Sequence, residues 1–150
     1  MNWDAHFMDI CDTISRKSKD RSTNVGAVIV GSNKSCRSMG YNGMPRGIDD
    51  DVDERHERPT KYLWFEHAER NAIYNAASNG TALEGCTMYI NSLPPCCDCA
   101  RAIIQSGIIE VVVNSFDSPE RWKEQCDIAI GMLKEAKVNI RLSDMGADDE

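Results

Sequence analysis

The chain has 150 residues and a formal net charge of −7, so it is long enough for one domain with a buried core and an acidic surface. Its hydrophobic share of 41% and charged share of 27% are typical of a soluble globular protein and exclude a low-complexity chain. The acidic balance argues against a nucleic-acid partner, because such binding depends on many Lys and Arg contacts.

Apolar segments, the N-terminus and the cysteines together indicate the cellular compartment of the protein. No apolar run approaches the ~20 residues that cross a bilayer, and the N-terminus lacks a basic region followed by an apolar stretch. Seven cysteines, an odd number without regular spacing, favour a reducing compartment over a disulfide scaffold. We therefore expect a cytoplasmic protein without membrane contact.

The first half of the chain predicts one helix, two strands and a long loop. Apolar residues at steps of three and four over residues 3–14 predict an amphipathic helix that ends near Lys19. The β-branched run 25–31 predicts a buried strand, with 37–41 as its hairpin partner. Residues 42–60, rich in Gly, Pro and acidic side chains, predict a loop of the long kind that is usually functional or mobile.

Helices and strands alternate in the second half. The complete order α, β, β, α, β, α, β, α, β predicts an α/β fold with a mixed sheet of about five strands between helices on both faces. One domain is expected over 1–142, followed by an acidic, disordered tail at 143–150. The predicted helices of this half cover 65–78, 95–107 and 118–136, and the predicted strands cover 86–91, 108–114 and 138–142.

Four residues at two neighbouring helix starts predict a metal-dependent site. His67 opens one predicted helix and Cys96 and Cys99 open the next, at the sheet end where α/β proteins bind ligands. One imidazole and two thiolates are zinc ligands that leave a fourth position open for water. Glu69 is placed to take a proton from that water, and His-x-Glu followed by Pro-Cys-x-x-Cys is the signature of zinc-dependent nucleobase deaminases.

Other interpretations of these cysteines stay open at this point. A thioredoxin-like redox pair would explain neither His67 nor Glu69. A purely structural zinc would need a fourth protein ligand, for which His56 and Cys97 are the candidates. Otherwise Cys97 is a small buried residue, and the same core role is expected for Cys11, Cys36, Cys86 and Cys126.

A short basic stretch interrupts the acidic composition. In SRKSKDRS, residues 15–22, four basic side chains outweigh the single Asp20. Such a small basic lip suits one phosphate group better than a nucleic-acid strand, although a solvated helix end is an equally good interpretation of any one of them.

Five motifs together cover nearly all of the chain: SKDRSTNVGAVIV, GYNGMPRG, HAERNAI, LPPCCDCA and GIIEVVV. They resemble the deoxycytidylate (dCMP) deaminase family of the cytidine deaminase superfamily. The motif GYNGMPRG distinguishes this family from other deaminases, because the zinc signature alone also fits nucleoside, tRNA and polynucleotide deaminases. The resemblance implies a cytidine-deaminase-like three-layer α/β/α fold and hydrolytic deamination of dCMP to dUMP, a precursor of thymidylate, with release of ammonia.

The resemblance also implies roles for individual residues. Zinc would be held by His67, Cys96 and Cys99, with Glu69 as the proton shuttle. One Zn²⁺ per chain is expected, because the loop 49–60 lacks the extra cysteines that hold a second zinc in some relatives. The implied substrate contacts are Ser22, Thr23, Asn24, Asn42, Ala68 and Phe116, the last as a stacking aromatic or else a core residue. The phosphate candidates are Lys19, Arg21 and Arg46.

Regulation and assembly are expectations of the same kind. Many relatives are hexamers that dCTP activates and dTTP inhibits, with effectors near the turn formed by Gly40, Tyr41, Asn42 and Gly43. This turn is present, so we expect a homo-oligomer (a hexamer, trimer or dimer) with such an effector site. The acidic run 49–54 could bind Mg²⁺ with a triphosphate effector, but a solvated loop is the better interpretation.

Four alternatives to the dCMP substrate or to catalysis remain. The substrate could be dCTP or a 5-substituted dCMP, since one phosphate or methyl changes little in a motif. A free-nucleoside deaminase would not need a phosphate lip, and a nucleic-acid deaminase would want a basic groove. A non-catalytic nucleotide-binding module would leave Glu69 idle.

Overall fold

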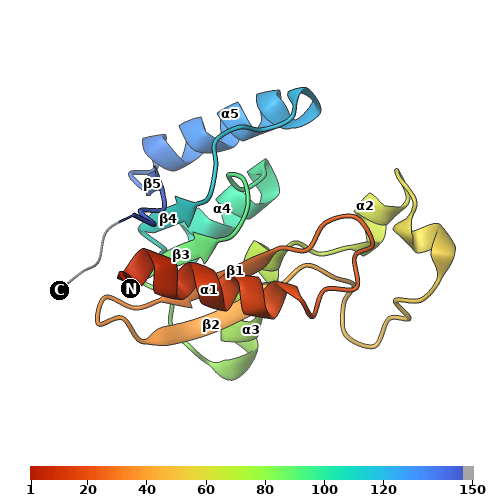
Figure 1. The fold of residues 1–150 in the computed structure, drawn as a ribbon, viewed down its shortest axis with the longest axis horizontal. Coiled ribbons are helices and arrows are strands. Elements are labelled where there is room, and N and C mark those ends of the chain that lie inside the picture. The colour runs from red at the N-terminus through yellow and green to blue at the C-terminus, as the bar shows by residue number, and fades with distance from the viewer. Residues whose placement is uncertain (147–150) are drawn as a thin grey trace.

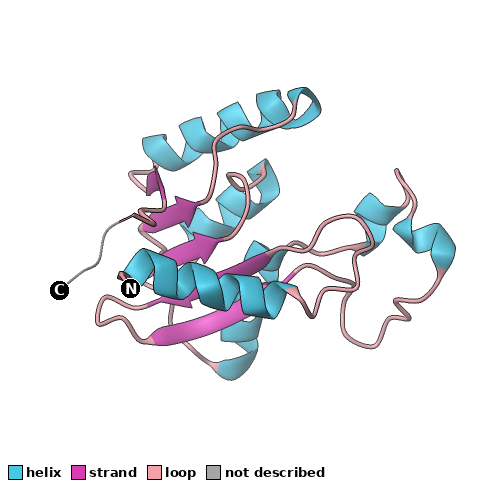
Figure 2. Cartoon of the chain, viewed as in Figure 1, coloured by secondary structure: helices cyan, strands magenta, loops and turns pink. Residues whose placement is uncertain are grey.

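A mixed five-stranded sheet lies between helices on both faces in the computed structural model, which describes residues 1–146 (Figure 1; Figure 2). The strand order is β2-β1-β3-β4-β5; β1 is antiparallel to both neighbours, and β3, β4 and β5 are parallel. The predicted three-layer fold is confirmed. The helices are α1 (Trp3–Ser15), α2 (Lys61–Trp64), α3 (Ala68–Asn79), α4 (Cys97–Gln105) and α5 (Glu120–Glu135), with a 3₁₀ turn η1 (Asp53–His56). The strands are β1 (Gly26–Val30), β2 (Cys36–Tyr41), β3 (Thr87–Ile90), β4 (Glu110–Val113) and β5 (Asn139–Leu142).

Two apolar cores hold the layers together. Helix α1 covers one face of the sheet, where its residues Phe7, Met8 and Cys11 pack against Val28 and Tyr89 (Figure 1). Helices α3, α4 and α5 cover the other face with a larger core that is rich in alanine next to the sheet. Small residues there let α3 and α4 approach the strands closely, which sets the positions of their first turns.

Helix α3 lies especially close to the sheet at Gly40 of β2. A Cβ added at Gly40 would lie 2.4 Å from the backbone nitrogen of Ala72 and 2.7 Å from the carbonyl oxygen of Ala68. Both atoms belong to the α3 backbone, so no side-chain rotation can make room for it. A glycine is therefore required here to seat α3 on the sheet.

Helix α1 ends at Ser15, earlier than the predicted end near Lys19. The following residues are fixed by side-chain hydrogen bonds instead: Ser18 Oγ donates to the carbonyl of Asn42 at 2.7 Å. Asp20 Oδ1 accepts from the Ser22 amide at 2.9 Å, which forms a tight turn. These contacts turn the chain away from the helix axis.

The segment before α3 also differs from the prediction, which placed a loop over 42–60 and began the helix at 65. Helix α2 and η1 lie in this region and extend beyond the sheet (Figure 1). Gly43 and Glu66 pair as an isolated antiparallel bridge, with hydrogen bonds of 3.1 and 2.8 Å, so α3 cannot start before Ala68. Helix α5 begins at Glu120, with Pro119 as its N-cap residue, whereas the predicted helix began at 118.

Three smaller findings complete the comparison. Residues 143–150 were predicted to be an acidic tail; Ser143 and Asp144 donate backbone hydrogen bonds to Val113 and Asp4, and 147–150 lie outside the described residues. Cys36 is exposed, so the predicted core role is wrong for this cysteine, whereas Cys11, Cys86 and Cys126 are buried. Within residues 1–146, no helix has the length and apolar character needed to cross a membrane.

Candidate active site

Three metal-ligand side chains meet at the starts of α3 and α4. His67 is the N-cap residue of α3, Cys96 is the N-cap residue of α4, and Cys99 lies in the first turn of α4. His67 Nδ1 is 3.4 Å from Cys96 Sγ and 3.4 Å from Cys99 Sγ. All three ligand atoms lie within 4.8 Å of one another. The tertiary structure therefore gathers residues that are about thirty positions apart.

These distances fit a tetrahedral zinc ion. Zinc–sulfur bonds of about 2.3 Å and zinc–nitrogen bonds of about 2.0–2.1 Å at tetrahedral angles separate neighbouring ligand atoms by roughly 3.5–3.8 Å. The distance of 3.4 Å from His67 Nδ1 to each sulfur requires only a slight expansion to reach this range. Among residues 1–146 the cluster contains no fourth His, Cys, Asp or Glu ligand, so the donor set matches a zinc site with one position for a non-protein ligand.

Neither of the predicted alternatives for a fourth ligand joins this cluster. His56 Nε2 lies 2.6 Å from the carbonyl oxygen of Asp50, in the loop before α2. Cys97 Sγ donates to the carbonyl oxygen of Gln125 in α5 at 3.4 Å. The Cys97 side chain thus joins α4 to α5, on a different side of α4 from its neighbour Cys96.

The three ligand side chains shift one another's pKa values. A hydrogen bond from Cys99 lowers the pKa of Cys96 to about 4, and interactions with His67 act in the same direction. Burial of the Cys96 side chain opposes this shift. The same Cys96–Cys99 bond and burial raise the pKa of the Cys99 thiol. The hydrogen bond to Cys96 raises the pKa of His67 to about 9 despite burial. Zinc binds thiolates and neutral imidazole, so its binding here would release protons.

Arg70 provides a positive charge beside the two sulfurs. Burial opposes this charge, but the charges of Cys99 and Glu66 raise the pKa of the guanidinium above its usual value. Its Nη2 is 2.5 Å from Glu66 Oε1, and its Nη1 is 3.5 Å from Asp98 Oδ2. Arg70 therefore ties the first turn of α3 to that of α4 and offsets negative charge on the cysteines.

Glu69, in the first turn of α3, is a buried carboxylate with 7% exposure. Burial raises the pKa of its carboxyl, while the positive charge of His67 acts in the opposite direction. A carboxyl whose pKa is raised from the acidic range can both accept and donate a proton. Glu69 lines the same cavity as His67 and Cys96, so this acid–base group shares its space with the metal ligands.

That cavity has a volume of about 340 Å³, which is in the range of small-molecule sites. Its walls come from the loop after α1, from Asn42 after β2, from α2 with the residues on either side of it, from the loop before α4, and from the first two turns of α5. Five segments that are separated in the sequence thus enclose the catalytic candidates.

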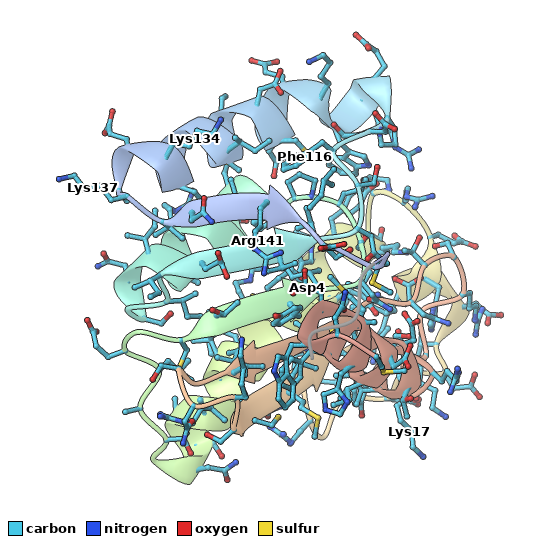
Figure 3. The ribbon with its side chains drawn as sticks, turned by 60° about the vertical axis from the view of Figure 1, so that its left-hand side comes forward. Asp4, Lys17, Phe116, Lys134, Lys137 and Arg141 are labelled. Atoms are coloured by element: carbon cyan, nitrogen blue, oxygen red, sulfur yellow. The ribbon has the colours of Figure 1, made fainter. Side chains whose placement is uncertain are left out.

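The predicted substrate contacts divide into two groups. Thr23, Asn42 and Ala68 line the cavity, whereas Ser22, Asn24 and Phe116 are not among its lining residues. Ser22 Oγ accepts a hydrogen bond from Lys61 Nζ at 2.7 Å and so supports the wall from behind. Phe116 is 39% exposed in the segment between β4 and α5 (Figure 3). The aromatic side chains that do line the cavity are Tyr62, Phe65 and Trp122.

Asn42 fastens two segments of the cavity wall. Its Oδ1 accepts from the Val25 amide at 2.8 Å, and its Nδ2 donates to the Thr23 carbonyl at 2.8 Å and to Asp20 Oδ2 at 3.2 Å. Both amide protons are used, so only one acceptor lone pair of Oδ1 is left for a ligand.

None of the three predicted phosphate candidates lines this cavity. Lys19 is exposed, Arg21 forms ion pairs of 2.9 and 3.5 Å with Asp53 and Asp51, and Arg46 donates to Asn75 Oδ1 at 2.5 Å. Among the lining residues, the long basic side chains are Arg58, Lys61 and Arg121, none of which the sequence reasoning identified. The local signal was weak, because Arg58 and Arg121 are single basic residues that follow Glu57 and Glu120.

The four residues of the predicted effector turn have different surroundings. Tyr41 and Gly43 line a second cavity of about 260 Å³, together with Arg46, Glu66 and Asn71. Asn42 lines the first cavity, and Gly40 packs beneath α3. The acidic run that was considered for Mg²⁺ is partly paired within the chain, since Asp51 and Asp53 bind Arg21.

Comparison with known proteins agrees with this geometry. Residues 1–115 match the model of the cytidine and deoxycytidylate deaminase zinc-binding region. The human deoxycytidylate deaminase is 42% identical over 120 residues, which cover 77% of this chain and 66% of that protein. The chain thus spans just under two thirds of the length of this curated relative.

Two further matches cover more of the length of the matched protein. A protein of Aliivibrio fischeri, named as an uncharacterised deaminase in the luxG 3′ region, is 39% identical over 140 residues, 92% of this chain and 91% of that protein. The crystal structure of the cyanophage S-TIM5 dCMP deaminase in complex with dCMP and dUMP superposes with a TM-score of 0.73 at 24% identity, over 91% of this chain and 93% of that one, which shows a shared fold. With its family match over the three metal-ligand residues, this chain belongs to the cytidine and deoxycytidylate deaminase zinc-binding family.

Proposed function

We propose that this chain is a zinc-dependent deaminase that converts dCMP and water to dUMP and ammonia. The observation that carries the proposal is the buried Glu69 in the same cavity as the His67, Cys96 and Cys99 cluster. The human relative that is 42% identical is a deoxycytidylate deaminase, which supports the choice of a cytosine nucleotide as substrate.

His67, Cys96 and Cys99 would hold the zinc ion, whose chemistry at this site is the activation of water as a nucleophile at neutral pH. Glu69 accepts the proton that the attacking water loses and returns it to the ring nitrogen N3. The same carboxyl then moves a proton to the departing amine, so that water and cytosine yield uracil and ammonia. A raised pKa suits Glu69 to this alternation, because each transfer must be reversible near neutral pH.

The other residues that line the cavity provide surfaces for the substrate rather than reacting groups. Ala68 and Thr23 provide small surfaces near the reacting groups, and the aromatic side chains of Tyr62, Phe65 and Trp122 provide flat apolar surfaces for a base. The burial of Glu69 limits its contact with bulk water, which strengthens the electrostatic interactions of this carboxyl.

The test is ammonia release from a panel of dCMP, dCTP, 5-methyl-dCMP and deoxycytidine. We expect the wild-type protein to prefer dCMP and Glu69→Gln to lose about 10²–10⁴-fold in kcat while keeping its zinc. Glu135→Gln, an exposed carboxylate at the end of α5, is the matched control and should keep full activity. Unchanged dCMP turnover in Glu69→Gln would remove the acid–base role on which the proposal depends.

Several finer features stay predictions from the sequence. These are one zinc ion per chain, activation by dCTP and inhibition by dTTP, Mg²⁺ at a triphosphate effector, homo-oligomer formation and a cytoplasmic location. The second cavity beside Tyr41 and Gly43 is the place where we propose to look for the effector.

A further inference from the structure

We propose that Asp20 and Lys61 are positioning residues for the deamination, because their buried ion pair holds three segments of the cavity wall in the arrangement that binds the substrate. This inference rests on the proposed function and deepens it, since it names residues that act on the substrate through their neighbours. Both residues line the cavity, and neither was among the site residues expected from the sequence.

The ion pair is almost withdrawn from solvent. Lys61 Nζ is 2.8 Å from Asp20 Oδ1, and the two side chains are 8% and 6% exposed. Lys61 is the first residue of α2, which lies beyond the sheet beside the loop after α1 (Figure 1). Because the burial of two charges costs about as much free energy as their attraction returns, such a pair is better explained by the conformation that it fixes than by stability alone.

The Asp20 carboxylate joins three segments of the wall. Its Oδ1 accepts from Lys61 Nζ at 2.8 Å and from the Ser22 and Thr23 amides at 2.9 and 3.3 Å. Its Oδ2 accepts from Asn42 Nδ2 at 3.2 Å. These donors belong to α2, to the loop after α1 and to the residue that follows β2. An ionised carboxylate suits this position, because both of its oxygens accept hydrogen bonds and neither donates one.

Asp20 keeps its charge despite its burial. Burial would raise the pKa of this carboxyl, but hydrogen bonds from Lys61, Ser22 and Thr23 lower the pKa below its usual value. At neutral pH the group is therefore an acceptor on both oxygens, and all of its donors can be held at once.

Two side chains transmit the effect of the pair to the substrate space. The bond from Asn42 Nδ2 to Asp20 fixes the orientation of the Asn42 amide, whose oxygen and nitrogen could otherwise exchange places. Lys61 Nζ lies 5.4 Å from the centroid of the Phe65 ring, and the Lys61 carbonyl accepts from the Phe65 amide at 3.0 Å. Asn42 and Phe65 both line the cavity, whereas the acid–base group Glu69 lies on α3. Loss of the pair should therefore impair binding more than chemistry.

The kinetic experiment measures dCMP turnover by Asp20→Asn, Lys61→Met and the double variant. We expect each single change to raise KM by about ten- to a hundredfold and to leave kcat within about threefold, because groups that bind the substrate are displaced while the reacting groups stay in place. Lys123→Met breaks an exposed ion pair of 2.9 Å with Asp127 in α5; it is the matched control and should leave both constants unchanged.

The double variant separates positioning from stability. Each single change leaves one buried charge unpaired and should lower the unfolding midpoint, whereas removal of both charges should restore most of it. KM should stay raised in the double variant, because an amide at position 20 has one acceptor oxygen and cannot serve both Asn42 and the turn at Ser22. A KM that recovers together with the midpoint would show a merely structural pair and would overturn the proposal.

Amide hydrogen exchange tests the arrangement of the wall without any turnover. Residues 20–25 and 57–65 should exchange about tenfold faster in all three variants, while β1 and β3 keep their protection in the double variant. Wild-type protein that releases no ammonia, with faster exchange of these segments in the variants, would overturn the proposed function and keep the pair as the organiser of the cavity wall. Wild-type activity with unchanged KM and unchanged exchange in every variant would overturn the positioning role and keep the function.

Discussion

The carboxylate of Asp4 joins both ends of the chain to the sheet, and its replacement should destabilise the fold. Arg141 of β5 donates to it from Nη1 at 2.7 Å and from Nη2 at 3.1 Å (Figure 3). The Tyr89 hydroxyl and the Asp144 amide donate to it at 2.9 and 2.7 Å. Asp4→Asn removes the charge that all four donors share while keeping the side-chain shape.

The pKa of Asp4 provides the magnitude. Burial alone would raise it, but the hydrogen bonds from Arg141, Asp144 and Tyr89 lower it from 3.8 to about 2. At about 1.4 kcal/mol for each tenfold change in proton affinity, this difference corresponds to roughly 2.4 kcal/mol of folding free energy. The Arg141 side chain is 37% exposed and partly screened by solvent, so we expect Asp4→Asn to lose about 2 kcal/mol at pH 7.

The pH dependence has a definite sign. A carboxylate with a lowered pKa in the folded state stabilises the protein fully above its unfolded pKa, and this contribution is lost as pH falls through the folded pKa. The difference between wild type and Asp4→Asn should therefore be constant from pH 7 to about 5. It should shrink below about pH 4 and approach zero near pH 2.

Urea unfolding at a series of pH values, with metal concentration held constant, measures this difference. Asp9→Asn is the matched control, because Asp9 is exposed on the same helix and should change stability by less than about 0.5 kcal/mol. A difference below about 0.5 kcal/mol for Asp4→Asn at pH 7, or one that grows as the solution is acidified from pH 5, would refute the reasoning.

Three further changes probe the packing and the metal cluster. Gly40→Ala should lower stability by about 1–3 kcal/mol, seen as a drop of several degrees in thermal unfolding, because its Cβ would meet the α3 backbone at 2.4 Å; an unchanged melting temperature would contradict the close approach. Lys61→Met should cost about 3 kcal/mol in denaturant unfolding, since it leaves a buried carboxylate unpaired, and a loss under 1 kcal/mol would show that the pair is not needed. Metal analysis of purified protein should find zinc in Cys97→Ser and little in Cys96→Ser, because only Cys96 belongs to the cluster; equal zinc in both would reject the assignment.

The sequence predicted the layers correctly because they depend on local patterns. Alternating helical and strand periodicity is a property of neighbouring residues, and it located every strand of the sheet to within two residues at each end. The missed boundaries depend on distant contacts instead. Helix α1 ends early because Ser18 binds the Asn42 carbonyl, and α3 starts late because Glu66 pairs with Gly43. Periodicity within one segment carries no information about either contact.

The same distinction applies to the site. His67, Cys96 and Cys99 could be placed together because each lies at the start of a helix that follows from the strand pattern. The basic lip after α1 was predicted to bind phosphate, but Arg21 is neutralised by Asp53, thirty-two positions later in the chain. Whether a basic side chain is available to a ligand depends on such pairing, which composition in a short window cannot show.

The predicted effector turn shows why a motif can be present for more than one reason. Gly40 is required for the packing of α3, and Asn42 uses its amide to hold the wall of the first cavity. Both residues would be needed in this fold with or without an effector. Tyr41, by contrast, is 42% exposed and lines only the second cavity of the two described. The predicted effect of dCTP is therefore best tested with a change at Tyr41, because this change leaves the wall of the first cavity intact, whereas a change at Asn42 would disturb that wall.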